Sequence, residues 1–372
     1  RLFGEGAFNS AFVPIFAKKL EGEGPDAART FAEEAMAGLL FVLLIVTIFA
    51  ELTMPFLMYG LAPGFDATPD KFELSVLLTR ITMPYLLCMS LVALMSGALN
   101  SVGRFFESAS VSVVLNLVMA VATLISLWLG YKREPEAGII QALAVFVSGF
   151  LQLALLMWGM PKAGMRLGFR WPRMTDDMRR LVKLGIPGVI SGGVTQINIA
   201  IGTVIASLQP GAVSQLYYAD RVYELPLSIV GIAVGVVLLP DVARQLRAGD
   251  TAGVMDSQNR SLEFAMLLTV PATLALAVIP HDIVRVLFER GAFHPEDTAN
   301  TASLLAMFAL GLPSFVMIKV FSPIYFARED TKTPMRYAVI SLTANTIGSI
   351  VLFFVLRELG MMPQLGIAIA TT

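Results

Sequence analysis

Long apolar segments alternate with short polar segments along the whole chain. Each long segment is nearly free of charge, and each reaches or approaches the ~20 residues that carry a helix across a ~30 Å hydrocarbon layer. Proline, glycine and charged residues cluster at the segment ends. The clearest of these segments are 36–50, 86–103, 111–130, 139–160, 186–210 and 228–240. The pattern predicts an all-α polytopic membrane protein.

Eleven spans are predicted, of which the first and last are partial. The connections between them are short, as is usual between neighbouring transmembrane helices. The predicted spans are about 1–20, 36–61, 76–102, 108–131, 137–161, 180–208, 212–246, 260–288, 298–326, 334–357 and a last one from 365.

Lysine and arginine residues are unevenly divided between alternate connections. One set of connections carries seventeen of them and the other set carries five. Cytoplasmic loops carry the excess of positive charge in membrane proteins. The set that includes the basic segment 162–183 is therefore predicted to be cytoplasmic. The opposite set, which includes the connection 209–216 before the 212–246 span, is predicted to face outward.

Composition and motifs exclude several function classes. The net charge is −1, so no basic field favours a nucleic-acid partner. The chain has one cysteine, Cys88, and two histidines, which supply neither a disulfide nor a Cys/His metal cluster. Nucleotide-binding loops and hydrolase or metalloenzyme motifs are missing from the sequence. We therefore expect a protein that is not an enzyme.

An internal repeat relates the two halves of the chain. The segment 12–28 resembles 238–253, with Pro14 matching Pro240 at an offset of 226. The offset stays close to this value farther along, at 229 for the pair Asn116 and Asn345. Six spans separate the members of each pair, so both copies have the same orientation. This is a parallel repeat about an axis along the membrane normal, one of the recognised symmetries of transporters.

The repeat predicts the domain organisation. We expect two six-helix bundles around a central cavity: an N-terminal lobe at 1–165, a basic cytoplasmic linker at 166–180 and a C-terminal lobe at 181–372. Extrapolating the repeat predicts that both ends are truncated. We expect roughly fifty residues to precede position 1 and the last helix to be incomplete.

One charge cluster lies inside a predicted span, where ionisable residues are costly and usually face a cavity or a partner. Asp220, Arg221 and Glu224 are spaced so that the first two reach Glu224 on a helix. The 212–246 helix would be about 50 Å long, with a kink predicted at Pro226. The guanidinium of Arg221 presents several N–H donors in one plane, a geometry that suits phosphate oxygens. We favour a cavity-facing cluster over a solvated helix cap.

Three further charged residues are candidates. Glu5, flanked by Gly4 and Gly6, belongs to the first copy of the same repeated element and is predicted to face the cluster across the cavity. The side chain of Lys319 is either buried or extends to the membrane–water interface. For Arg80, extension to the membrane–water interface is favoured.

Four stretches carry a family resemblance. They resemble the MurJ (MviN) family of bacterial lipid II flippases, within the multidrug/oligosaccharidyl-lipid/polysaccharide exporter superfamily. The resemblance covers essentially the whole chain. The stretches are "RLFGEGAFNSAFVPIFA" (1–17), "LAPGF" (61–65), "LYYADRVYELPLSIVGIAVGVVLLP" (216–240) and "VFSPIYFAREDTKTP" (320–334).

The resemblance implies a fourteen-helix protein of the bacterial inner membrane. Such a protein flips undecaprenyl-pyrophosphate-linked disaccharide pentapeptide, lipid II, from the cytoplasmic to the periplasmic leaflet by alternating access. We expect a monomer surrounded by membrane lipids, without a cofactor. Coupling to the membrane potential, H⁺ or Na⁺ stays open.

The resemblance also implies roles for individual residues. Arg221 matches an arginine of the family's cationic cavity. Arg1 matches the second member of an Arg-Arg pair, and Glu5 matches a functionally important glutamate. The family's sodium site would include Asn345 and Ser349, but Ser349 stands where a carboxylate is expected.

Three alternatives are weighed against lipid II flipping. The first is a flippase or exporter of another polyprenyl-pyrophosphate-linked oligosaccharide. The second is a drug/cation antiporter of the same superfamily, which predicts a cavity dominated by acids rather than by Arg221. The third is a membrane enzyme of lipid-phosphate chemistry, which requires a metal-binding acidic pair or a nucleophile.

Overall fold

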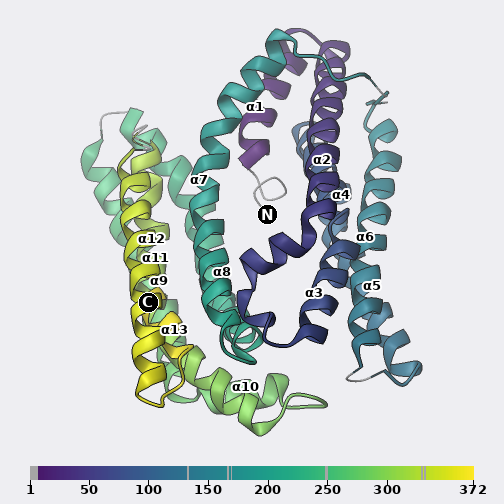
Figure 1. Ribbon diagram of the computed structural model, residues 1–372. Coiled ribbons are helices and arrows are strands. Elements are labelled where there is room, and N and C mark those ends of the chain that lie inside the picture. The colour runs from purple at the N-terminus through teal and green to yellow at the C-terminus, as the bar shows by residue number, and fades with distance from the viewer. Residues whose placement is uncertain are drawn as a thin grey trace. The chain divides into compact units, whose positions relative to one another are not determined.

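The chain folds into helices joined by short connections (Figure 1). This computed structural model describes residues 7–131, 134–165, 167–168, 170–247, 250–327, 330 and 332–372. A 3₁₀ turn, η1, covers Pro63–Phe65. The α-helices in this part of the chain are α1 (Ala7–Gly22), α2 (Pro25–Leu61), α3 (Pro69–Thr82), α4 (Tyr85–Ser101), α5 (Phe105–Trp128), α6 (Pro135–Lys162), α7 (Asp176–Ser207), α8 (Ala212–Arg247), α9 (Thr251–Val278), α10 (Pro280–Phe288), α11 (Pro295–Ala327), α12 (Lys332–Glu358) and α13 (Leu365–Thr371).

The predicted all-α membrane architecture is confirmed. Among the described residues, seven segments are long and apolar enough to cross a membrane: α2, α3 with α4, α5, α6, α9, α11 and α12. Large apolar side chains of α2 point away from the protein, with Leu52 and Phe56 exposed by 75% and 80%. Lipid solvates such side chains, while the helix satisfies its own backbone hydrogen bonds.

Two predicted spans are interrupted. The segment predicted at 76–102 is α3 followed by α4, with Pro84 between them. The segment predicted at 260–288 is α9 followed by α10, which begins at Pro280. Proline lacks an N–H and clashes with the preceding turn, so it favours a helix start over a helix interior. At Pro226, in contrast, α8 continues as a helix.

The start of α9 also differs from the prediction. It begins at Thr251, about nine residues before the predicted span, because Asp250 caps it. The carboxylate of Asp250 accepts a hydrogen bond of 2.8 Å from the amide of Gly253. A side-chain acceptor at this position satisfies an amide that has no partner within the helix.

The chain divides into two compact units, an N-terminal unit at 1–196 and a C-terminal unit at 197–372. The division falls within α7. The lobe bounds predicted from the sequence, with a linker at 166–180 and a second lobe from 181, stay a prediction.

Helices α1, α2 and α4 pack together in the N-terminal unit. Phe12 of α1 is fully buried there, and its ring stacks on Phe16 and Phe31 with centroids 5.5 Å apart in each pair. Helices α5 and α6 pack beside α4. Offset stacks of aromatic rings add to the free energy gained by burying their surface.

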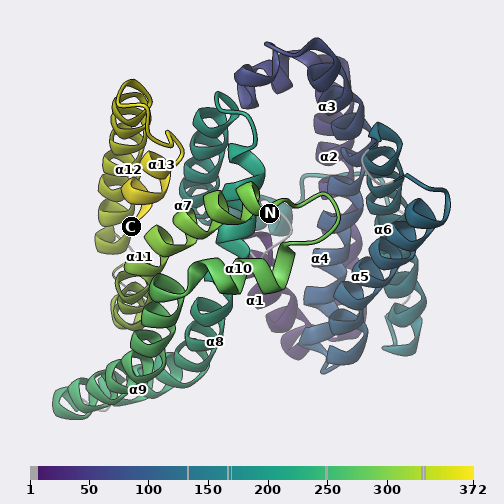
Figure 2. The ribbon, with the colours of Figure 1, turned by 90° about the horizontal axis from the view of Figure 1, so that it is seen from below.

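The C-terminal unit repeats this packing. Helices α2 and α9 begin at Pro25 and Thr251, and α3 and α11 begin at Pro69 and Pro295, so both pairs of starts are 226 positions apart (25 to 251, 69 to 295). Helix α1 contacts α2 and α4, and α8 contacts α9 and α11 in the same way. The pair α5 and α6 corresponds to α12 and α13, which lie side by side in Figures 1 and 2. The internal repeat seen in the sequence is therefore a repeat of structure.

Candidate substrate-binding site on helix α8

Helix α8 carries a polar stripe on its first half. Ser214, Tyr217, Arg221 and Glu224 follow one another at spacings of three, four and three residues, which places them on one helix face. All four are exposed or half-buried. The buried positions on this half of the helix, which face the interior of the C-terminal unit, are Ala212, Gln215, Ala219, Val222 and Tyr223.

Arg221 is held by two neighbours on this stripe. Its Nη1 donates a hydrogen bond of 2.8 Å to Oε2 of Glu224, and the two side chains are 41% and 37% exposed. Its guanidinium lies 4.9 Å from the ring centroid of Tyr217. A cation over an aromatic face is attracted to it electrostatically. The guanidinium is therefore oriented and still accessible, as an anion-binding group must be.

The opposite face of α8 fixes the position of the stripe. Tyr223 packs against Phe308 and Phe315 of α11, with ring centroids 5.8 and 5.9 Å apart. Val222 and Ala219 are buried in the same cluster. A polar stripe backed by close-packed aromatic side chains has little freedom to move, which favours preorganised binding.

The structure brings together part of the predicted site. Arg221 and Glu224 are paired as expected. Asp220 is half-buried on the same turn, and its place in the substrate-binding cluster stays a prediction. Arg1 and Glu5 lie outside the described residues. Lys319 on α11 and Arg80 on α3 are both exposed.

Asn345 and Ser349, the candidate cation ligands, are linked to each other. Ser349 donates from Oγ to Oδ1 of Asn345 at 3.2 Å, and Nδ2 of Asn345 donates to Oγ1 of Thr371 at 3.1 Å. Hard cations prefer oxygen ligands, with carboxylates to offset their charge. These three side chains are neutral, and the Asn345 oxygen already accepts a hydrogen bond. They fit a structural contact between α12 and α13 better than a Na⁺ site. Within the described residues, acidic, histidine and cysteine side chains form no cluster suited to a metal.

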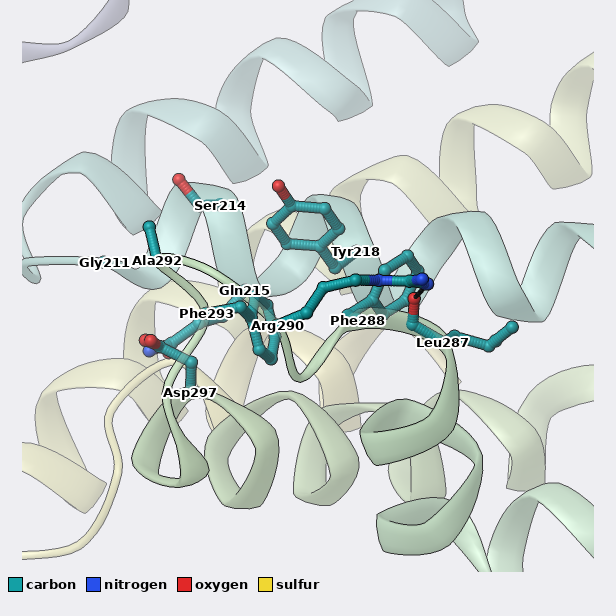
Figure 3. A pocket seen from close by; sticks show the side chains of 10 residues that line it. All are labelled: Gly211, Ser214, Gln215, Tyr218, Leu287, Phe288, Arg290, Ala292, Phe293 and Asp297. Atoms are coloured by element: carbon teal, nitrogen blue, oxygen red, sulfur yellow. Dashed lines mark hydrogen bonds between the residues drawn. The ribbon is translucent and has the colours of Figure 1, made fainter. Parts of the chain in front are cut away.

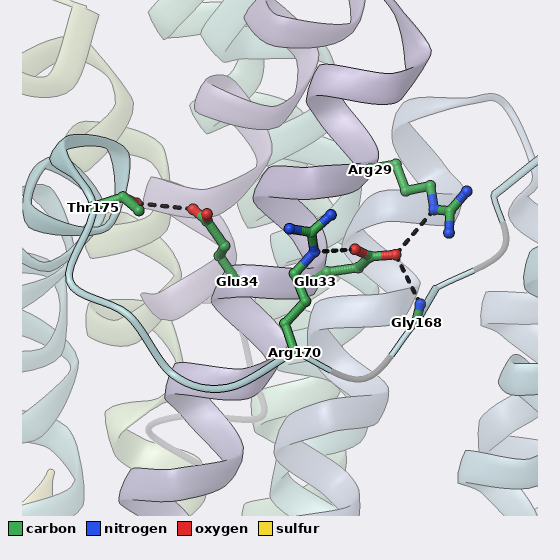
Figure 4. A network of polar contacts seen from close by, with 6 residues as sticks. All are labelled: Arg29, Glu33, Glu34, Gly168, Arg170 and Thr175. Atoms are coloured by element: carbon green, nitrogen blue, oxygen red, sulfur yellow. Dashed lines mark hydrogen bonds and ion pairs between the residues drawn. The ribbon is translucent and has the colours of Figure 1, made fainter.

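Sequence reasoning missed two features. One is a pair of recesses beside the start of α8, lined by residues of α8, α10 and α11 and of the neighbouring connections. The other is a polar network around Glu33 of α2, shown in Figure 4. The spacing of Arg29 and Glu33 signals their ion pair within the helix. Arg170 also pairs with Glu33, but it lies 137 positions farther along the chain, and no local sequence pattern links the two residues.

Comparison with known proteins assigns the chain to a family. The model of the family described as "Lipid II flippase MurJ" matches residues 1–372. A protein of Rhizobium tropici named "Probable lipid II flippase MurJ" is 49% identical over 362 residues, which cover 97% of this chain and 68% of that protein. This chain thus spans about two thirds of that relative's length.

Two solved structures share the fold. A structure titled "Lipid II flippase MurJ, inward closed conformation" matches with a TM-score of 0.80 and 24% identity, covering all of this chain and 74% of the other. An inward-facing multidrug resistance MATE family transporter of the MOP superfamily matches with a TM-score of 0.79 and 13% identity, covering all of this chain and 82% of the other. The fold is thus common to the MurJ structure and the MATE transporter structure, so the fold alone does not separate them. Sequence similarity does: this chain belongs to the family of the lipid II flippase MurJ.

Proposed function

We propose that the full-length protein moves lipid II from the cytoplasmic to the periplasmic leaflet by alternating access. Its family and its apolar helices make it a multi-pass protein of the bacterial inner membrane. The observation that carries the proposal within this chain is Arg221, an accessible arginine on a helix of membrane length. The reaction is transport, in which no bond of the lipid is broken, so we propose no enzymatic activity.

Arg221 is proposed as a contact for the pyrophosphate of lipid II. A pyrophosphate carries about two negative charges, and removing it from water is costly unless cations and hydrogen-bond donors replace the water. The guanidinium fork presents several donors in one plane and suits phosphate oxygens. Tyr217 and Glu224 hold that plane in place before the lipid arrives.

The energy source is proposed to be the membrane potential or a proton gradient rather than Na⁺. The neutral, mutually hydrogen-bonded Asn345 and Ser349 support this choice. We propose a monomer surrounded by membrane lipids, with lipid II as its substrate and without a cofactor.

Complementation tests the proposal. The full-length gene is expressed in cells depleted of their own MurJ, and growth and the appearance of lipid II at the periplasmic face are measured. The wild-type gene should restore both, Arg221→Ala should restore neither, and Arg221→Lys should be partial because it keeps the charge but loses the fork.

The matched control is Arg260→Ala. Arg260 is 77% exposed on α9 and pairs with Asp256 four positions away, as a surface arginine does. This variant should support growth like the wild type. Failure of the wild-type gene to restore translocation would refute the function. Full activity of Arg221→Ala would refute the assignment of the pyrophosphate contact.

A further inference from the structure

Two adjoining recesses lie within the C-terminal unit, beside the first two turns of α8. The first, of about 660 Å³, lies between α8, the end of α10 and the loop before α11 (Figure 3). The second, of similar volume, extends past the start of α11 to the start of α13. Gly211, Gln215 and Asp297 line both. Each volume falls in the range of small-molecule sites, about 300–1,000 Å³.

Aromatic side chains form one wall of the first recess. The ring centroid of Tyr218 lies 4.9 Å from that of Phe288 and 5.3 Å from that of Phe293. The three rings come from α8, α10 and the following loop, and each is half-buried. Arg290 extends across this wall in Figure 3, where its guanidinium donates to the carbonyl oxygen of Leu287. The wall therefore offers flat apolar faces with polar groups at the rim.

A buried amide pair lines the second recess. Nε2 of Gln364 donates to Oε1 of Gln215 at 3.0 Å, and the two residues are only 4% and 7% exposed. The side-chain oxygen of Gln364 has no hydrogen-bond partner among the described residues. A buried acceptor left unpaired is unfavourable, because it has lost its water without gaining a partner. Gln364 lines the second recess, where a ligand N–H or O–H supplies the missing donor once the amide turns toward it.

The charges around the recesses disfavour an anion. Asp297 and Glu296 contribute carboxylates to the second recess. Arg290 is the basic residue among the described side chains that line the first. Aromatic faces, amides, a serine hydroxyl and carboxylates together suit a ligand rich in hydroxyl and amide groups. An amino sugar with N-acetyl groups has this chemistry.

We propose that the two recesses bind an N-acetylated sugar of the lipid-linked substrate, on the side predicted to be periplasmic. The proposal rests on the proposed function and adds a site for the headgroup sugar. Ser214, at the recess, and Arg221, the proposed pyrophosphate contact, are seven residues apart on one stripe, about 10 Å along the helix. Tyr217 and Tyr218 connect the two places, with ring centroids 6.2 Å apart. Adjacent parts of one substrate can therefore contact both.

Direct binding of a soluble sugar tests the proposal without requiring transport. Detergent-solubilised full-length protein is mixed with N,N′-diacetylchitobiose, and saturation transfer to the acetyl methyl protons is measured by NMR. Cellobiose, which lacks the acetamido groups, serves as the control sugar. The wild type should transfer saturation to diacetylchitobiose and several-fold less to cellobiose.

Two tryptophan variants separate recess filling from general damage. Ser214→Trp adds bulk at an exposed position that lines the first recess, so it should abolish the transfer. Ala299→Trp adds the same bulk at an exposed position of α11 outside the lining, so it should leave the transfer intact. Thermal unfolding of both variants checks that each is folded.

The outcomes separate this proposal from the proposed function. Arg221→Ala should bind the sugar like the wild type while failing to translocate lipid II. Absence of sugar binding by a wild-type protein that translocates lipid II overturns the sugar site and leaves the function standing. Equal binding by Ser214→Trp and the wild type, or equal binding of both sugars, also overturns it.

Discussion

Arg170, in the connection between α6 and α7, donates from Nε to the buried carboxylate of Glu33 on α2. The same carboxylate accepts hydrogen bonds from Nε of Arg29, at 2.9 Å, and from the amide of Gly168, at 2.8 Å (Figure 4). Glu33 is 2% exposed, whereas the two arginines are 42% and 47% exposed. Three donors thus converge on one carboxylate and attach the connection to the start of α2. The pKa of Arg170 is raised, chiefly by its hydrogen bond to Glu33.

Glu33→Ala should detach this connection from the N-terminal unit. Substitution leaves Gly168 N–H and two arginines without their acceptor, at a cost of about 1–3 kcal/mol, because the arginines can still reach water. We expect a lower midpoint of thermal unfolding in detergent. We also expect faster trypsin cleavage between 166 and 173.

The neighbouring Glu34 provides the matched control. It accepts one hydrogen bond of 2.8 Å, from Oγ1 of Thr175. Glu34→Ala should therefore lower stability by only about 0.5–1.5 kcal/mol and leave cleavage at 166–173 nearly unchanged. Equal effects of the two substitutions would show that Glu33 does not hold the connection.

Asp330 should make the start of α12 sensitive to acid. Its Oδ1 accepts hydrogen bonds from the amides of Thr333 and Lys332, at 3.0 and 3.1 Å. The pKa of Asp330 is lowered, first by a hydrogen bond to the Thr333 side chain and then by one to its amide. A lowered pKa stabilises the fold above the unfolded-state value, roughly 4, and the stabilisation is lost as the pH falls through the folded value.

Hydrogen–deuterium exchange of the 332–340 segment measures this effect. After correction for intrinsic rates, exchange in the wild type should accelerate below pH 4. Asp330→Asn keeps a capping oxygen that does not titrate, so its exchange should be independent of pH. Asp330→Ala should exchange quickly at every pH. A wild-type profile without pH dependence would exclude this role for Asp330.

Gly366→Ala should destabilise the contact between α12 and α13. A Cβ at Gly366 would lie 2.6 Å from backbone atoms of Leu352 and Phe353, so one helix must move. Overpacking of this kind costs about 1–3 kcal/mol. At Gly202 of α7, an added Cβ would lie 4.0 Å from Ile367, an ordinary contact. Gly202→Ala should therefore be neutral or stabilising by about 0.5–1 kcal/mol. Thermal unfolding that ranks the two variants in the opposite order would contradict this packing.

Transport should not require Na⁺. Full-length protein in proteoliposomes should translocate a fluorescent lipid II analogue at the same rate in NaCl and in KCl. The reason is that Asn345 and Ser349 bring no carboxylate to the candidate cation site. Collapsing the membrane potential or the pH gradient separately then identifies the driving force. A rate that falls in KCl would restore the Na⁺ hypothesis.

Local spacing in the sequence is enough to predict part of the fold and part of the candidate site. The pairing of Arg221 with Glu224 follows from helical periodicity, because residues three apart share a helix face. The helix positions follow from apolar periodicity, since a chain in lipid must satisfy its backbone within each segment. The repeat follows from residues that match at a nearly constant offset along the chain. The breaks before α4 and α10 coincide with Pro84 and Pro280, although the apolar pattern predicts uninterrupted spans there. A proline can kink, start or sit within a helix, and Pro226 lies within one.

The sequence by itself determined the membrane class, the repeat, the family resemblance and the arginine on α8. All of these depend on patterns between near neighbours or on similarity along the chain. Only the tertiary structure decided that Gln215 pairs with Gln364, 149 positions away. It also decided that Tyr218, Phe288 and Phe293 form one wall, and that Arg170 reaches Glu33. These contacts depend on how helices distant in sequence pack together, and the type and spacing of the residues carry no local record of that packing.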